Sequence, residues 1–498
     1  MKPFALAFAL LCLALPAHAA TPDKDAAFRA DLDVFLTEAM KRLETVPAVS
    51  VAVAHASGPV EMRALGYADL TRKIPATPET PFYIASATKA VVGTTFAALE
   101  QSGRINLDWT LADLASDIRF HPSIDPAKVT LRHLLTHTHG LENNALAWRL
   151  AFTGDPGPDA AWQILAHTVA DPEAPLGTYR YGNVGYNIAT LLIERKLGQR
   201  WQDLVEAEVL IPLGMHKTFA KGLDQHAVAL PYLGAGPKGW EAGLSKTDST
   251  LQSAGGLYSN ARDMGIWLSA QLKAHAGATS ALAPALRLSH APTATLTDDF
   301  AGFKRTGYGL GWYSGTYDGA PFFHAFGSFS GFRSHTSFMP DRDLAVAVLS
   351  NDDAIGFRLT DIVAAFAYDW YGQGPAHAKA RGETALAALD AQEAAFPGRV
   401  ADQRAKLAAR PWLLTLPKTA YAGRWCNSDY GDLTIEVAGD DMIVRMARLS
   451  GIATAFTKED TIRVELVPNQ GDVMTFKVSG KQVTGLIIKE AAFSRTCP

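Results

Sequence analysis

The length, composition and charge of the chain already exclude several classes of protein. Its 498 residues are 48% hydrophobic and 19% charged, with a formal net charge of −4. This apolar content is ample for a large core, and the length predicts two or three structural units. Because no basic cluster stands out, we do not expect nucleic-acid binding. No Walker or dinucleotide-type glycine pattern follows a predicted strand, and we expect no cofactor.

The N-terminus predicts export. A charged start precedes an apolar run from Phe4 to Leu15, and an Ala-x-Ala site follows it. This order is typical of a cleavable secretory signal, so residues 1–20 are predicted to be removed after Ala19 or Ala20. We therefore expect a periplasmic or secreted protein. The apolar run is too short to cross a bilayer and no later stretch is long enough, which predicts no transmembrane segment.

Residue periodicity then predicts an α+β catalytic domain over residues 25–372. Apolar positions at helical spacing predict a helix over 25–46, and the segment from Leu107 to about Gly239 is mostly helices and loops. A helical insert framed by sheet strands leaves a cleft between the two regions. The expected strands are 48–54, 60–65, 307–313, 332–339 and 344–349.

The last quarter of the chain predicts a separate unit. Residues 373–417 are rich in Ala, Arg and Gln and suit a helical linker. Over 418–498, short alternating segments predict a small up-and-down β unit of barrel-like type. Cys426 and Cys497 lie in this unit, and an oxidising compartment favours a disulfide between them over two buried thiols. The expected strands of the unit are 433–437, 442–446, 461–466, 474–478 and 483–488.

One short motif points to nucleophilic chemistry. Ser86-Ala87-Thr88-Lys89 is the only Ser-x-x-Lys of the chain, and it opens an apolar stretch that ends at Gly103. A serine on the first turn of a helix lies near unpaired N–H groups, and a lysine three residues later shares its face. A buried lysine loses its proton near neutral pH and can then activate the serine. The alternative is a helix cap followed by a solvated lysine.

A second motif, Tyr181-Gly182-Asn183, lies in a loop just before a predicted helix. A tyrosine beside a lysine can have its phenol ionised, which would make Tyr181 a usable base. The alternative is a packing aromatic at a junction between loop and helix. A rival match at Tyr258-Ser259-Asn260 is better explained by Ser259 or Asn260 capping the following helix.

A third segment, Phe322 to Phe332, is rich in glycine and aromatic residues and leads into a strand. Such a strand edge can offer a backbone N–H to an oxyanion, opposite the N–H of Ser86. We expect Gly327 or Ser328 to supply this donor. A tight turn with aromatic core residues is the alternative.

Together these residues resemble the serine β-lactamase and penicillin-binding-protein-like hydrolases, in particular their class C β-lactamase, D-peptidase and esterase branch. The resemblance covers about residues 28–355 and extends to three further segments. They are 129–141 (VTLRHLLTHTHGL), 253–257 (SAGGL) and 340–344 (PDRDL).

The resemblance implies a β-lactamase/transpeptidase-like fold, with an antiparallel sheet flanked by helices. It implies that Ser86 is the acylated nucleophile and Lys89 its activator. Tyr181 would be the general base and acid, and Asn183 would orient Lys89 and the substrate amide. The trailing β unit resembles the lipocalin-like domain that often follows such hydrolases.

The chain departs from the family at the third motif, where the family carries Lys-Thr-Gly or His-x-Gly. Counting back from Gly331 aligns Gly327 with the family glycine and Ala325 with the cation, so that His324 lies one residue early. One residue along a strand reverses the face of the sheet, unless a bulge corrects it. His324 is thus a candidate substrate-binding residue only from a shifted position, which favours ester or peptide substrates.

The spacing of His133, His137 and His139 could suggest zinc. No Asp-His follows, and the resemblance makes this segment scaffolding, so we expect no metal. The sequence therefore predicts a serine hydrolase acting on ester, amide, D-amino-acid peptide or β-lactam-like substrates. The alternative is a catalytically weak, penicillin-binding-like sensor of the cell envelope. Oligomeric state is not encoded in any motif that we recognise.

Overall fold

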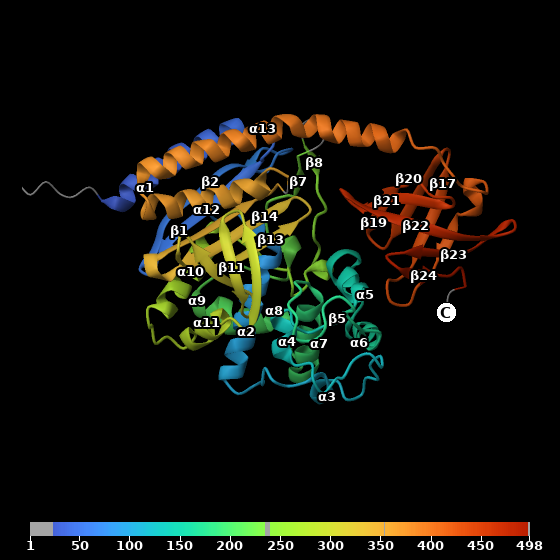
Figure 1. The fold of residues 1–498 in the computed structure, drawn as a ribbon, viewed down its shortest axis with the longest axis horizontal. Helices are drawn as coiled ribbons and strands as arrows, with labels where there is room; N and C mark the ends of the chain where they lie inside the picture. The colour runs from blue at the N-terminus through green and yellow to red at the C-terminus, as the bar shows by residue number, and fades with distance from the viewer. Residues whose placement is uncertain (1–22, 235–239, 353, 497–498) are drawn as a thin grey trace, which may run out of the picture.

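The computed structural model describes residues 23–234, 240–352 and 354–496, and a nine-stranded antiparallel sheet forms its centre (Figure 1). The strands run in the order β10-β11-β12-β13-β14-β15-β1-β2-β3. The two ends of the catalytic region therefore meet in the middle of the sheet, where β15 pairs with β1. The bounds are β1 (Ala48–His55), β2 (Gly58–Asp69), β3 (Ile74–Pro75), β10 (Ala294–Phe300), β11 (Phe303–Tyr308), β12 (Tyr313–Tyr317), β13 (Ala320–Phe329), β14 (Phe332–Met339) and β15 (Leu344–Ser350).

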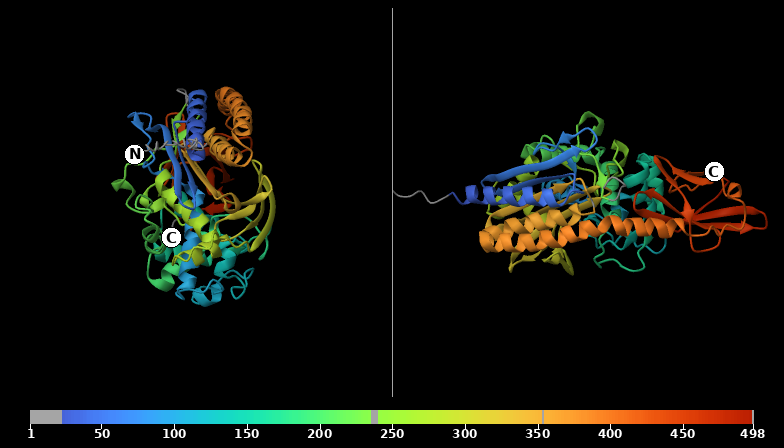
Figure 2. Two further views of the ribbon diagram at one scale, coloured as in Figure 1. Left: turned by 90° about the vertical axis from the view of Figure 1, so that its left-hand side faces the viewer. Right: turned by 90° about the horizontal axis from the view of Figure 1, so that it is seen from above.

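Helices cover both faces of this sheet, which explains why its central strands are apolar along their whole length. Val51 on β1 lies opposite Val348 on β15, and both are fully buried. One face packs against α1 (Lys24–Arg42) and α12 (Gly356–Gly372), and α13 (Pro375–Ala408) packs on these two helices; the three lie side by side in Figure 2. The other face packs against α10 (Ala261–His275), α11 (Ala283–His290) and α2 (Thr88–Gln101).

The remaining residues between α2 and α10 form the helical region below the sheet in Figure 1. Its helices are α3 (Leu111–Leu114), α4 (Leu131–Leu135), α5 (Asn144–Trp148), α6 (Pro158–Ala166), α7 (Val184–Leu197), α8 (Trp201–Val205) and α9 (Ile211–Leu213), with single turns η1 (Ala85–Ala87), η2 (Arg149–Thr153), η3 (Glu206–Leu210), η4 (Leu223–Gln225) and η5 (Asp248–Thr250). A further turn, η6 (Pro340–Arg342), joins β14 to β15. Three two-stranded ladders complete the region: β4 (Phe82–Tyr83) with β9 (Tyr258–Ser259), β5 (Leu141–Glu142) with β6 (Val169–Ala170), and β7 (Tyr232–Leu233) with β8 (Glu241–Ala242).

The predicted α+β class and β-lactamase/transpeptidase-like fold are confirmed, and so is the cap of α10, where the Asn260 side chain accepts from the Asp263 amide. The single strand expected over 307–313 is wrong. The chain leaves β11 at Tyr308 and begins β12 at Tyr313. Between them Gly311, at φ +98°, packs against α2 so closely that a Cβ would lie 2.3 Å from the Lys89 carbonyl oxygen. The apolar alternation here reflects packing against α2.

The C-terminal part consists of two small antiparallel sheets in sequential strand order. An isolated bridge between Cys426 and Ser494 brings the first and last strands together. Cys426 is disulfide-bonded, and its predicted partner Cys497 lies outside the described residues, as does the predicted signal at 1–20. The elements are η7 (Lys418–Ala420), β16 (Gly423–Trp425), β17 (Leu433–Ala438), β18 (Asp441–Met446), β19 (Leu449–Ile452), β20 (Thr454–Ala455), β21 (Thr461–Val467), β22 (Gln470–Ser479), β23 (Gln482–Ile488) and β24 (Ala491–Phe493).

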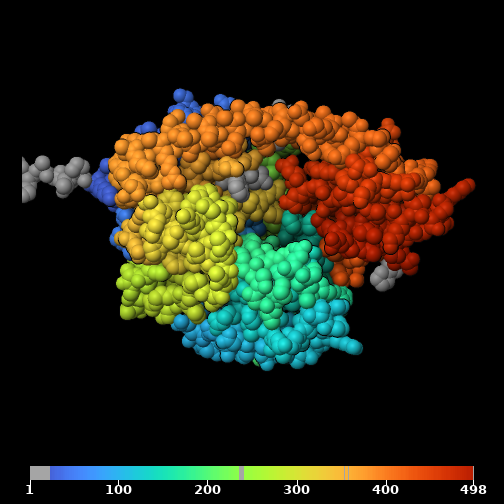
Figure 3. Space-filling model, in the orientation of Figure 1, coloured from blue at the N-terminus to red at the C-terminus, as the bar shows by residue number. Residues whose placement is uncertain are grey.

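This C-terminal part, which follows α13, packs against the helical region. Figure 3 shows it in red, seated against the teal residues of the helical region. The Nδ1 atom of His167 lies 2.9 Å from an Asp429 carboxylate oxygen, and Arg448 donates to the Ser245 carbonyl at 2.6 Å. The face of the C-terminal part next to the helical region is therefore fixed in position.

Candidate active site

Ser86 lies on η1, a single turn that is held from three sides. The amide of Ile84 donates to the Leu257 carbonyl, and the Ile84 carbonyl accepts from the Ser334 hydroxyl at 2.7 Å. Gly327 approaches so closely that a Cβ would lie 1.9 Å from the Ile84 carbonyl oxygen. The residue before the nucleophile, Ala85, takes the left-handed φ of +47°, a conformation that costs energy for an alanine. The serine itself stays partly exposed.

Lys89 is buried directly beside this serine. Its Nζ atom lies 3.1 Å from Ser86 Oγ, 2.9 Å from Asn183 Oδ1 and 2.7 Å from the Ala254 carbonyl oxygen. Its exposed fraction is 1%, and burial lowers the pKa of its ammonium to about 7. The lysine is therefore poised to exchange a proton at neutral pH.

The three contacts define what a neutral Lys89 does. A neutral amine has two N–H bonds and one lone pair. Asn183 Oδ1 and the Ala254 carbonyl oxygen are acceptors only, so they take the two N–H bonds. The lone pair then faces the Ser86 hydroxyl, which is the geometry needed to remove its proton.

Tyr181 reaches the same hydroxyl from the loop before α7. Its phenol hydrogen-bonds Ser86, and its ring centroid lies 4.9 Å from the Lys89 Nζ. Burial, reinforced by Tyr313, nevertheless raises the pKa of this phenol well above its ordinary value. The structure therefore favours a protonated Tyr181 near neutral pH and does not support the ionised phenol suggested by the sequence.

Sequence reasoning missed the aromatic cage around Tyr181. The ring of His137 packs on it at 4.5 Å between centroids, and Tyr313 stacks on it at 6.2 Å. His137 Nε2 also lies 3.2 Å from the Tyr308 hydroxyl. Burial, followed by the charge of Lys89, holds the pKa of His137 well below its ordinary value, so this imidazole is neutral. His137 thus positions Tyr181.

The edge of β13 faces the nucleophile. β12 pairs with β13 only between Ala320 and His324, so the strand from Ala325 to Phe329 continues beyond that ladder. Gly327 packs on η1, and Ser328 next to it is exposed. This geometry is compatible with a backbone donor at Ser328 opposite the amide of Ser86.

His324 is not brought to the nucleophile. It is fully buried on the opposite face of β13, with its ring 4.4 Å from that of His335, and its Nδ1 accepts from Arg305 at 2.9 Å. Its assignment as a substrate-binding residue is not supported, because no bulge interrupts the register of β13 with β14 and the face stays reversed. Burial, followed by the charges of His335, Arg305 and Arg333, holds the pKa of His324 well below its ordinary value.

The three histidines of the 129–141 segment also point to separate partners. His133 caps α4 through Thr130, and the Nδ1 of His139 accepts from the Leu141 amide. The group of side chains that could surround a cation, among the residues described, is instead His324, His335 and Asp361. Two buried arginines adjoin this group, which disfavours a metal ion there.

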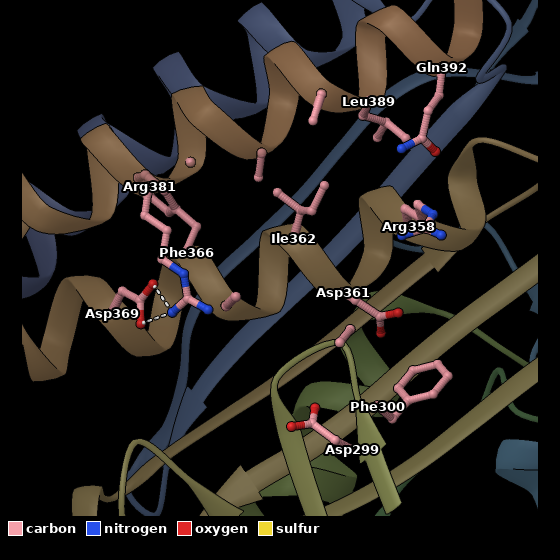
Figure 4. Close-up of a pocket in the computed structure, with 15 residues that line it drawn as sticks. Asp299, Phe300, Arg358, Asp361, Ile362, Phe366, Asp369, Arg381, Leu389 and Gln392 are labelled. Atoms are coloured by element: carbon pink, nitrogen blue, oxygen red, sulfur yellow. Dashed lines mark hydrogen bonds and ion pairs between the residues drawn. The ribbon is translucent and has the colours of Figure 1, made fainter.

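A cavity of about 430 Å³ lies next to this group, on the face of the sheet remote from Ser86 (Figure 4). Figure 4 shows Asp361 and Ile362 from α12 and Leu389 from α13 around it, closed by Phe300 from the β10–β11 hairpin. None of the predicted site residues lines it.

Comparison with known proteins agrees with the fold. The Beta-lactamase family model matches residues 36–368, and the chain belongs to this family. It is 27% identical over 322 residues to unguisins hydrolase ungD' of Aspergillus campestris, covering 61% of this chain and 58% of that protein. It is 25% identical to penicillin-binding protein 4 of Amycolatopsis lactamdurans, covering 65% of this chain and 86% of that one.

Two solved structures share the fold. The octameric penicillin-binding protein homologue from Pyrococcus abyssi has a TM-score of 0.58 at 20% identity, covering 93% of this chain and 99% of its own. The D-amino acid amidase from Ochrobactrum anthropi has a TM-score of 0.53 at 21% identity, covering 73% of this chain and 98% of its own. In the described part of the chain, no helix is both long and apolar enough to cross a membrane.

Proposed function

We propose that the chain is an exported serine hydrolase that forms an acyl-enzyme at Ser86 and hydrolyses ester, amide or D-amino-acid peptide bonds. The observation that carries the proposal is the position of the Lys89 amine, which is buried, has a pKa near 7 and lies 3.1 Å from Ser86 Oγ. The names of the hydrolase relative and the amidase neighbour support the same reaction class.

In the proposed acylation, Ser86 Oγ bonds to the substrate carbonyl carbon while its proton passes to the Lys89 lone pair. The carbonyl oxygen becomes an oxyanion, held by the backbone N–H groups of Ser86 and Ser328. When the bond to the leaving group breaks, Tyr181 gives its phenolic proton to that group. The Lys89 ammonium then returns a proton to Tyr181.

Deacylation repeats these transfers with water. A water molecule loses a proton to the Tyr181–Lys89 pair and bonds to the acyl carbon. The ester bond to Ser86 Oγ then breaks, and the serine recovers its proton. Asn183 keeps Lys89 in place throughout, because its Oδ1 accepts one of the lysine N–H bonds.

The decisive experiment is the intact mass of the protein after incubation with a fluorophosphonate and, separately, with a penicillin. We expect an adduct with the fluorophosphonate in the wild type and none in Ser86→Ala, together with turnover of a p-nitrophenyl ester. Absence of any adduct in the wild type would refute the proposal.

The second candidate function, a slow-turnover sensor, draws on one observation. Ala325 occupies the position of the family cation and is buried among apolar residues, so no side-chain charge there attracts a substrate carboxylate. A sensor would take up penicillin once and keep it, whereas a hydrolase would release several equivalents of product per Ser86.

A further inference from the structure

The cavity of about 430 Å³ on the face of the sheet remote from Ser86 is large enough for a small ligand. It lies between α12 and α13, with the β10–β11 hairpin along its third side (Figure 4). None of the residues of the proposed mechanism lines it. A molecule bound in this cavity would therefore occupy a site separate from the proposed active site.

Small side chains keep the space between the two helices open. At Gly382, α13 approaches so closely that a Cβ would lie 2.8 Å from the Phe35 ring and 3.2 Å from the Phe366 ring. These two rings stack at 4.2 Å between centroids, and Phe366 lines the cavity. Beside this close contact, Ala365 on α12 and Ala385 on α13 line the cavity with side chains too short to fill it. The space is thus bounded by packed groups.

The middle of the cavity is apolar. Ile362 from α12 and Leu389 from α13 face each other across it in Figure 4. Leu389 is buried, whereas Ile362 stays partly exposed. Covering such apolar surface is favourable by about 25 cal/mol per Å². An apolar chain of a ligand would therefore be stabilised between the two helices.

Polar side chains gather at one end of this apolar stretch. Arg358 and Gln392 lie near each other there in Figure 4. Arg358 is exposed, and in the described part of the chain its guanidinium has no ion-pair partner within 4 Å. A guanidinium binds a carboxylate or a phosphate through two parallel hydrogen bonds. This end of the cavity therefore suits an anionic group that stays close to water.

The carboxylates that line the cavity already have partners. Asp369 accepts from the Arg381 guanidinium at 2.9 Å, and one Asp361 oxygen lies 2.7 Å from His335 Nδ1. Asp299 accepts from a backbone amide of its own hairpin at 3.0 Å. Their negative charge is thus engaged within the protein, whereas the charge of Arg358 is available to a ligand.

We propose that this cavity binds a single-chain amphiphile, that is, an acyl chain with one anionic head group. Arg358 pairs with the head, Gln392 donates beside it, and the chain lies between Ile362 and Leu389. From Arg358 to Asp369, α12 rises about 16 Å, a length suited to an acyl chain of medium length. The head can be the carboxylate of a fatty acid or a phosphate monoester, since a guanidinium binds both. This site goes beyond the proposed function, because it needs no chemistry at Ser86.

Calorimetric titration of the protein with decanoate, decyl phosphate and decanol tests the site. We expect both anions to bind, and decanol to bind about tenfold more weakly, equivalent to about 1.4 kcal/mol. Arg358→Gln removes the charge at an exposed position and should weaken both anions about tenfold while leaving decanol unchanged. Arg119→Gln, at an exposed position of the helical region, is the matched control and should change none of the affinities. The tighter of the two anions identifies the head group.

A second variant tests the apolar part of the site. Ala385→Leu extends a side chain into the cavity and should weaken all three probes at least about tenfold. Equal affinity of the three probes for the wild type, or anion binding unchanged in Arg358→Gln, would overturn the proposal. The same loss in Arg119→Gln would assign the effect to overall charge and would also overturn it. So would dimerisation that Ala385→Leu abolishes, without binding of either anion, because the cavity would then belong to an interface between copies.

Discussion

Lys89 and Asn183 are joined by a hydrogen bond of 2.9 Å that ties the first turn of α2 to the start of α7. The two residues lie 94 positions apart in the chain, and each comes from a different short motif. Asn183 and the Ala254 carbonyl each accept one N–H bond of the neutral lysine. Its lone pair therefore faces the Ser86 hydroxyl. The bond therefore fixes the direction of proton transfer.

The first prediction concerns pH. Burial lowers the pKa of Lys89 to about 7, and only the neutral amine accepts the serine proton. We expect kcat/KM for a p-nitrophenyl ester to be low at pH 5, to rise through pH 7 and to level off above pH 8. Lys89→Met should lower kcat/KM at least about a thousandfold and abolish its rise with pH. A flat profile between pH 5 and 8 would contradict the role of this lysine.

A carboxylate in place of Asn183 should shift the pH at which kcat/KM rises. Asn183→Asp sets a negative charge beside the ammonium, which stabilises the charged form and raises the pKa of Lys89 by about one unit or more. The rise of kcat/KM is then expected above pH 8. Asn106→Asp, on an exposed loop, changes the net charge equally and should leave the rise of kcat/KM near pH 7. The same shift in both variants would assign it to overall charge.

Gly327 should tolerate no side chain. Its Cβ would meet the Ile84 carbonyl oxygen at 1.9 Å, so Gly327→Ala must displace either β13 or the turn that carries Ser86. We expect a loss of about 1–3 kcal/mol in the free energy of unfolding, together with a fall in kcat. Gly398→Ala, in α13 with open space around it, should instead gain about 0.5–1 kcal/mol. Equal melting temperatures for the two variants would count against the packing argument.

The buried carboxylate of Asp361 stabilises the far face of the sheet. One of its oxygens lies 2.7 Å from His335 Nδ1 and the other 3.6 Å from the Arg333 guanidinium. Asp361→Asn removes one negative charge beside a fully buried arginine and should lower the free energy of unfolding by about 3 kcal/mol. Asp441→Asn, on an exposed strand end, should change it little. Chemical denaturation of both variants measures the difference.

The residues predicted to act together from local motifs do meet. Ser86 on η1 and Lys89 in the first turn of α2 lie three residues apart, and this spacing brings them together. Tyr181 and Asn183 lie in the loop just before a helix. The apolar stretch after Val184 predicts this helix. The alternation of apolar and polar residues also predicts C-terminal strands, because such strands bury one face.

What the sequence could not show depends on contacts between distant segments. His137 packs on Tyr308, which is 171 residues away, and neither has a local pattern that marks it as part of the site. The break at Gly309–Trp312 looked like part of a strand because its apolar residues face α2. The cavity between α12 and α13 likewise leaves no pattern in the sequence, because two helices and a hairpin distant from them in the chain form it together.

The contacts that hold the Ile84 carbonyl have a consequence for the newly made chain. The Ser334 hydroxyl that binds the Ile84 carbonyl comes 250 residues later, and Gly327 packs on the same oxygen. The strained turn at Ala85 lacks both of these contacts until β13 and β14 have been synthesised and folded onto it. Until then, the Ser86 hydroxyl is not held in the position beside Lys89 that its proposed role requires. The geometry of the site is complete only when the second half of the domain has folded onto the first.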